Sequence, residues 1–283
     1  MGSTFVLGER RLSGEHGRVI VLGSVEASDG GFRSAWIMGE SALSRVKVKK
    51  TLRCMGELTG DTVQLHSGSV MGEVRLKGLC SADRLSVTGD LQAEYLRCRL
   101  LRCAPIHGSG SKPSWSGVLE GTTLEIQEEI ALDFEHRFQN ILASAPLRAA
   151  EEISCENLYC FGGLAARSVN ADHICIVLTG GGAPLTAGHL AGGRIRIVKS
   201  FRPDKELEAI PAQTRYPALQ CEEKVLFQAD AVEGDVVEME SARIGTVSGG
   251  RIKIGPLSVV DRVEYTQSIE ISPKAAVGEV IAL

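Results

Sequence analysis

Two cysteine pairs are the first candidates for chemistry in this chain of 283 residues. Cys98 and Cys103, and again Cys155 and Cys160, are separated by four residues. Zinc is bound by cysteine pairs at similar spacing when all the thiolates converge on one point. However, Cys103 and Cys160, like Cys54, occupy a place where the repeat described below predicts an inward-facing side chain. Buried cysteine commonly packs as a small apolar residue, so we expect core packing and no metal site.

Other reactive residues do not combine into a site. The six histidines contain no pair at i, i+4, and His173 with Cys175 on one strand face would supply only two ligands. Gly180–Gly193 is rich in glycine like a phosphate-binding loop, but it lacks the Gly-Lys-Ser/Thr sequence that binds phosphate and metal. No arrangement of Ser, His and Asp can be assembled. We therefore expect no catalytic residue, no cofactor and no enzymatic activity.

A repeat dominates the chain from Val19 to Ala93. Its glycines recur alternately at i+16 and i+17, and they are Gly23, Gly39, Gly56, Gly72 and Gly89. The places two and four residues before and after each glycine are apolar in 17 of 20 cases, whereas the residues between them are often polar. Alternation with a period of two predicts β-strand, because successive side chains point to opposite faces. The longer period predicts a solenoid, since one repeat cannot bury its own apolar face.

These patterns predict an all-β protein, a right-handed parallel β-helix of triangular cross-section with 16–17 residues per coil and an irregular insertion. We expect residues 1–18 to form an N-terminal arm or cap and residues 19–106 to form coils. Residues 107–150 are expected to form a loop and insertion, with strand favoured up to Asp133 and strand or helix open beyond it. Residues 151–283 are expected to resume the coils around a surface loop at 201–224, because Ile252, Ile254 and Val260 recur at i+17.

Charge and composition exclude several classes of protein. The net charge of −4 argues against a general nucleic-acid binder, which needs a basic surface to displace counterions. No stretch approaches the ~18 consecutive apolar residues of a transmembrane segment. The eight cysteines come without a recognisable signal peptide, so we expect a cytoplasmic protein with reduced thiols.

The repeated coils resemble those of bactofilins, the polymer-forming cytoskeletal proteins of bacteria. Residues 232–280 (VEGDVVEMESARIGTVSGGRIKIGPLSVVDRVEYTQSIEISPKAAVGEV) are similar to the C-terminal part of the longer bactofilin-like proteins of endospore-forming bacilli, notably at Glu233–Asp235, Ile254–Pro256 and Val263–Tyr265. The resemblance covers residues 17–106 and 153–280. Typical members are shorter and have one uninterrupted β-helix. The resemblance implies a right-handed β-helix that joins end to end into nucleotide-independent filaments. It also implies a scaffold for cell shape, envelope or motility structures. We expect a cytoplasmic location, with membrane association, where it occurs, made through partners.

Two other functions stay open from the sequence. The first is a β-helix adaptor that does not polymerise and whose insertion and loops recruit a protein partner. The second is a β-helix enzyme acting on carbohydrate. Spacings of 16 and 17 do not fit the 18-residue coils of the hexad acyltransferases, and Asp61, Asp83 and Asp90 are scattered rather than clustered as in calcium-dependent pectin-cleaving helices.

Two sets of residues are candidates for contacts with other copies. The open ends of a β-helix carry unpaired backbone groups that another strand could complete. We predict end-to-end contacts at Val19, Val21 and Val25 and at Ile269, Ile271, Val277 and Val280. A second set points outward beside the glycines of successive coils and predicts a lateral contact stripe: Leu22, Trp36, Met38, Met55 and Met71. We expect either residues 124–150 or another subunit to cover this stripe, unless the assignment of inward and outward faces is reversed there.

Overall fold

The computed structural model describes residues 2–104, 112–178, 184–199 and 225–283. Within these ranges the chain is all β, with thirteen strands and no helix, and it forms a parallel β-solenoid. The strands are β1 (Thr4–Asp61), β2 (Gln64–Thr88), β3 (Leu91–Cys103), β4 (Trp115–Ile126), β5 (Ile130–Ala131), β6 (Glu135–Ala143), β7 (Leu147–Cys160), β8 (Leu164–Val177), β9 (Leu185–Val198), β10 (Phe227–Met239), β11 (Ala242–Ile254), β12 (Val259–Ile271) and β13 (Ala276–Ala282).

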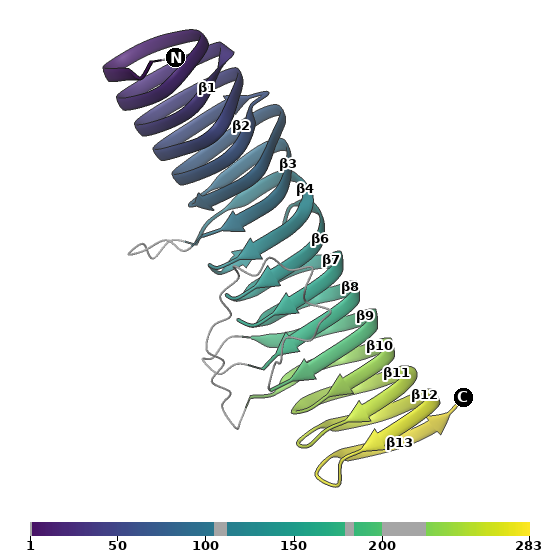
Figure 1. Ribbon diagram of the computed structural model, residues 1–283. Helices are drawn as coiled ribbons and strands as arrows, with labels where there is room; N and C mark the ends of the chain where they lie inside the picture. The colour runs from purple at the N-terminus through teal and green to yellow at the C-terminus, as the bar shows by residue number, and fades with distance from the viewer. Residues whose placement is uncertain (1, 105–111, 179–183, 200–224) are drawn as a thin grey trace. The chain divides into compact units, whose positions relative to one another are not determined.

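The chain divides into two compact units, Met1–Gln139 and Asn140–Leu283. In the first unit β1 pairs with β2, β2 with β3 and β3 with β4, all in parallel. In the second unit the parallel order runs from β7 through β8, β9, β10, β11 and β12 to β13. Figure 1 shows the ribbon of each unit winding coil upon coil, with β1 passing through several coils.

The strand register confirms the predicted period. Gly56 of β1 lies beside Gly72 of β2, which is the i+16 relation of the repeat, and Val48 lies beside Leu65, which is the i+17 relation. The recurrence near the C-terminus is confirmed too, because Ile254 pairs with Ile271 and Val260 with Val277. The hand of the coil and its triangular section stay predictions from the sequence.

The repeated glycines are required by the backbone of the solenoid. Gly39 has a φ of +133°, and a Cβ atom placed there would lie 2.0 Å from the carbonyl oxygen of Gly23. Gly56 repeats this geometry, since its Cβ would lie 2.2 Å from the carbonyl oxygen of Gly39. Only glycine combines this φ with so close an approach to the preceding coil. We call this column of stacked residues (Gly8, Gly23, Gly39, Gly56, Gly72 and Gly89) the glycine ladder.

The inward-facing places around the ladder form the core of the first unit. All twenty of the places singled out from the sequence are buried, including the three that are not occupied by apolar residues. Ser41, one of those three, donates a hydrogen bond from its hydroxyl to the carbonyl oxygen of Glu57 at 3.2 Å. The buried hydroxyl is therefore satisfied inside the core, as a buried polar group must be.

The structure corrects two of the predicted boundaries. Residues 4–18, expected as an arm or cap, belong to β1, and Val6 and Leu12 are buried there as core residues. Residues 115–126, 135–143 and 147–150, expected as part of an insertion, lie in strands β4, β6 and β7. The possible helix near residue 138 is a strand. The predicted surface loop at 201–224 lies outside the described residues.

The pattern is lost after residue 106 because the register changes. Val74 pairs with Leu91 at i+17, whereas Leu91 pairs with Trp115 at i+24, so the coil before Trp115 is longer by seven residues. At the same point the glycine ladder ends. The carbonyl oxygen of Gly89 accepts a hydrogen bond at 3.1 Å from the indole nitrogen of Trp115. The indole of Trp115 thus lies against Gly89, the last glycine of the ladder. Because the spacing also changes here, the repeat cannot be extended past this point with a fixed period.

Candidate contact surfaces

The core packing predicted for the cysteines is confirmed for six of the seven that the structure describes, and the seventh, Cys155, is half-buried. Cys54, Cys80, Cys103 and Cys160 are fully buried. Burial raises the pKa of the Cys98, Cys103 and Cys155 thiols to about 12, so they stay protonated at neutral pH. A protonated thiol is a poor nucleophile and a poor metal ligand. Cys221 lies outside the described residues.

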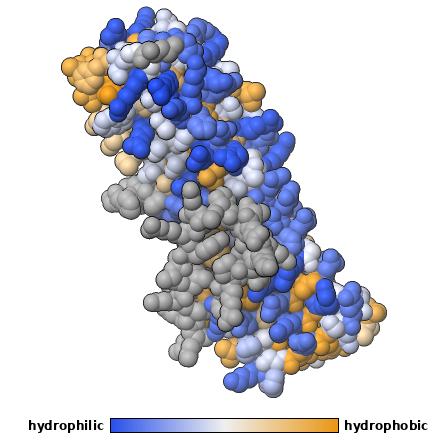
Figure 2. Space-filling view, in the orientation of Figure 1, coloured by the Kyte–Doolittle hydropathy of each residue, from blue (hydrophilic) through white to orange (hydrophobic). Residues whose placement is uncertain are grey.

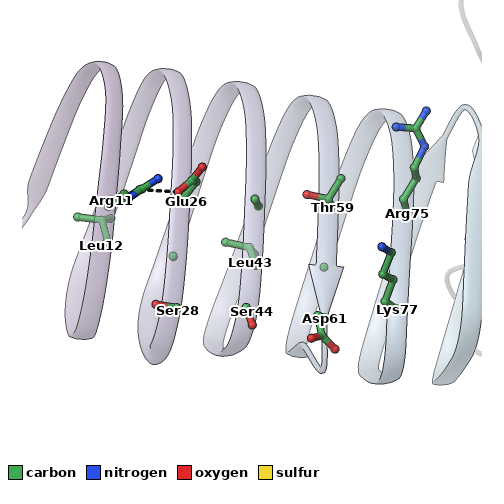
Figure 3. Close-up of a pocket in the computed structure, with 13 residues that line it drawn as sticks. Arg11, Leu12, Glu26, Ser28, Leu43, Ser44, Thr59, Asp61, Arg75 and Lys77 are labelled. Carbon is green, nitrogen blue, oxygen red and sulfur yellow. Dashed lines mark hydrogen bonds and ion pairs between the residues drawn. The ribbon is translucent and has the colours of Figure 1, made fainter.

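A shallow groove of about 730 Å³ crosses the coils of the first unit (Figure 3). Small side chains such as Ala42, Ser44 and Thr59 line its middle. At one end Arg11 binds Glu26 at 2.7 Å. The charges at that end neutralise each other, and the small side chains of the middle offer no acid–base pair. Asp61, Arg75 and Lys77 line the other end, where Arg75 is bound by Glu57 and Glu73. The groove is best explained as the place where the coils carry short side chains.

The predicted contact stripe lies on the surface. Leu22, Trp36, Met38 and Met55 are exposed, and the exposed fraction reaches 55% at Met71. Residues 124–150 do not cover the stripe, because Leu124, Ile141 and Leu147 are themselves buried within the coils of β4, β6 and β7. The expectation of an internal cover is therefore wrong, and so is the alternative of a reversed inward and outward assignment.

The exposed stripe is longer than the sequence alone indicated. Leu7 precedes Gly8, the first member of the ladder, and is 70% exposed, while Phe5 beside it is also exposed. Leu7 was missed because residues 1–18 were taken for an arm. The signal that could have revealed it is the i+15 relation between Gly8 and Gly23, which nearly matches the repeat. We call the residues immediately before the first five ladder glycines (Leu7, Leu22, Met38, Met55 and Met71) the apolar row; Thr88 stands before the sixth, Gly89.

Next to the apolar row lies a second hollow, of about 840 Å³, that is rich in cations. We call it the basic groove, and its charged side chains are Arg18, Arg33, Lys50 and Arg53. Trp36, Ser34 and Thr51 complete much of its lining, and none of the described residues that line it carries a carboxylate. The sequence did not reveal this groove, because its cations come from three coils and only their stacking brings them together.

The predicted contacts at the C-terminal end are partly uncovered core residues. Ile254 and Val263 are at most 1% exposed, whereas the residues that stack on them one coil later, Ile271 and Val280, are 41% and 46% exposed. Ile269 and Val277 are half-buried. In Figure 2 hydrophobic surface gathers over the last coils. The inward-facing column therefore ends without a cover among the described residues.

The predicted contacts at the N-terminal end are wrong. Val19, Val21 and Val25 are buried, because the coil formed by residues 4–18 precedes them in the stack. A Cβ atom on Gly23 would lie 2.3 Å from the carbonyl oxygen of Gly8, which shows how closely that coil is stacked. The N-terminal end of the stack is consequently the coil that contains Val6 and Leu12.

Among the described residues, no three or more His, Cys, Asp or Glu side chains are grouped so that they could hold a metal ion. In the same part of the chain no helix is long and apolar enough to cross a membrane. No protein-family model, curated protein or solved structure matches the chain.

Proposed function

We propose that this protein is a cytosolic structural scaffold that associates with itself end to end, in the manner of the bactofilins that its coils resemble. The observation that supports this proposal is the uncovered core of the last coil. Ile271 and Val280 have inward-facing positions that are buried one coil earlier, so a further coil supplied by a second molecule would bury them. Burying this apolar area favours association by about 25 cal/mol per Å².

The backbone supports the same mode of association. The strand β13 pairs with β12 on one side, and its other edge has no partner among the described strands. Unpaired N–H and C=O groups of such an edge are a template for another strand. The first coil, with Val6 and Leu12 in its core, begins at Thr4 and supplies a parallel edge of the kind that β13 could pair with. Polymerisation would then need no nucleotide, because it would extend the pairing already present between coils.

Purified protein tests this proposal by sedimentation velocity and negative-stain electron microscopy across a range of concentrations. We expect filaments or a ladder of oligomers. The variant carrying Ile271→Asp and Val280→Asp should sediment as a monomer, since each new carboxylate would be buried in the junction. Leu257→Asp is the matched control, because Leu257 is equally exposed in the second unit but does not belong to the inward-facing column. Wild-type protein that stays monomeric at high concentration would overturn the proposal.

A further inference from the structure

One face of the first coils combines two rows of different chemistry. Its cations come from places five or six residues before the ladder glycines, at Arg18, Arg33 and Lys50, and the apolar row comes from the places just before them. Trp36 and Arg53 lie between the two rows. Outward-facing residues of one strand are about 7 Å apart and neighbouring coils about 4.8 Å apart, so the two rows run side by side.

This face has no negative charge over five coils. None of the outward places that form it, from Ser3 to Met71, holds Asp or Glu. Of the carboxylates around it, Glu15 binds Lys49 at 2.8 Å and Asp83 binds His66 at 2.6 Å. Glu9 and Glu40 follow the ladder glycines and so lie on the far side of the apolar row from the cations.

Three other arginines of the same coils, Arg11, Arg45 and Arg75, are neutralised by carboxylates. Arg45 binds Asp29 in a bidentate pair, with its shorter contact at 2.5 Å, and Arg75 binds Glu57 at 2.7 Å. Among the described residues the four cations of the basic groove form no such pair. The positive charge of this face is thus left available for a partner.

Three kinds of partner can be compared with these two rows. A second copy docked face to face would bring Arg33 and Lys50 close to like charges, which costs free energy. A soluble polyanion would satisfy the cations but leave the Leu and Met side chains in water. An anionic bilayer satisfies both rows, because phosphate groups meet the cations while aliphatic side chains enter the boundary of the acyl chains.

We propose that this face binds the surface of an anionic lipid bilayer, with the basic groove against the headgroups and the apolar row inserted beside them. Trp36, which lines the groove and is itself exposed, lies between the two rows. This is the level at which tryptophan is enriched in proteins that contact membranes, because its ring is apolar and its N–H is polar. The protein would lie on the membrane and would not span it. The proposal is independent of end-to-end association, which uses the last coil.

Vesicle co-sedimentation of the full chain tests the proposal. The probes are vesicles of phosphatidylcholine alone and vesicles of equal parts phosphatidylcholine and phosphatidylglycerol. We expect binding to the anionic vesicles only, weakening as salt is added. The double variant Arg33→Gln with Lys50→Gln should bind about 25-fold more weakly, because each cation near an anionic surface contributes about fivefold. Lys77→Gln with Arg243→Gln removes the same charge from other surfaces and should change binding less than about twofold.

A second variant tests the apolar row. Met38→Ser with Met55→Ser leaves all charges in place and should weaken binding at least about tenfold, since two aliphatic side chains no longer leave water. Both methionines are exposed, so the thermal unfolding of this variant should match that of the wild type. Equal binding to neutral and anionic vesicles would overturn the proposal. It would also be overturned if the methionine variant bound like the wild type, or if sedimentation without lipid showed the methionines to be needed for self-association.

Discussion

In the first coils the exposed apolar side chains point outward from a complete core. Ile37 is fully buried, and Met38, the next residue in β1, is 41% exposed. In the last coil the exposed apolar side chains point inward, at places such as Ile271 where the preceding coil buries its residue. The apolar row is therefore an addition that the fold does not require. In the last coil, by contrast, the exposed residues are core residues that no further coil covers. Only the second kind of exposure is explained by the fold itself.

The same comparison separates what the sequence could and could not predict. A column of inward-facing residues obeys a strict period, so the core around Val21 and Ile37 followed from spacing alone. The N-terminal end of the stack did not, because Gly8 and Gly23 are related by i+15 and so depart from the i+16 and i+17 relations of the other coils. The coil that begins at Trp115 was missed because extra residues before it shift the register.

The contact surfaces were only partly visible in the sequence. The outward position of Met38 and Met55 followed from the period of two. The basic groove did not, because Arg18, Arg33 and Lys50 lie far apart in the sequence and at places that are not strictly equivalent. Their proximity depends on the stacking of three coils, and no local pattern encodes it.

The largest effect should come from breaking the glycine ladder that aligns the first coils. In Gly39→Ala the new Cβ would lie 2.0 Å from the carbonyl oxygen of Gly23, at a φ that alanine avoids. We expect a loss of about 3 kcal/mol or more in unfolding free energy, measured by urea denaturation. Gly14→Ala is the control: its φ is +78° but the space around it is open, so it should cost about 1 kcal/mol. Equal losses in the two variants would mean that close stacking is not what requires glycine.

A matched pair of substitutions sharpens the account of the last coils. Ile254 and Ile271 are stacked neighbours, the first buried and the second exposed. In dilute protein Ile254→Ala should cost about 3 kcal/mol, because it leaves a cavity, and Ile271→Ala less than about 1 kcal/mol. If molecules join at this end, the cost of Ile271→Ala should rise with protein concentration. Equal costs in dilute protein would show that the last coil is already covered.

The last effect is absent at neutral pH, arises only in alkaline solution and distinguishes the two regions chemically. Burial raises the pKa of Cys103 from its ordinary value of 9.0 to about 12. The unfolded chain therefore loses this proton first, so stability is complete below pH 9.0 and falls as the pH rises toward about 12, by at most ~1.4 kcal/mol per pH unit.

The measurement is urea denaturation repeated at several values of pH. Cys103→Ala should lower the stability at every pH but remove this part of the alkaline slope. The last coils, residues 225–283, contain no cysteine, so burial of a thiol contributes nothing to the pH dependence there. An unchanged slope in the variant would show that the Cys103 thiol reaches water in the folded chain.

The number of coils in the glycine ladder also sets the length of the outward face beside it. Each coil is held only by its neighbours, so coils can be gained or lost without redesigning the rest of the chain. Five of the six coils of the ladder each add one apolar side chain to the row, whereas the coil of Gly89 carries Thr88 at this place. Each of the five also extends the adjoining outward face. The strength of any contact made by that face would then be set by the number of repeats. Affinity could be adjusted in steps by duplicating or deleting a coil.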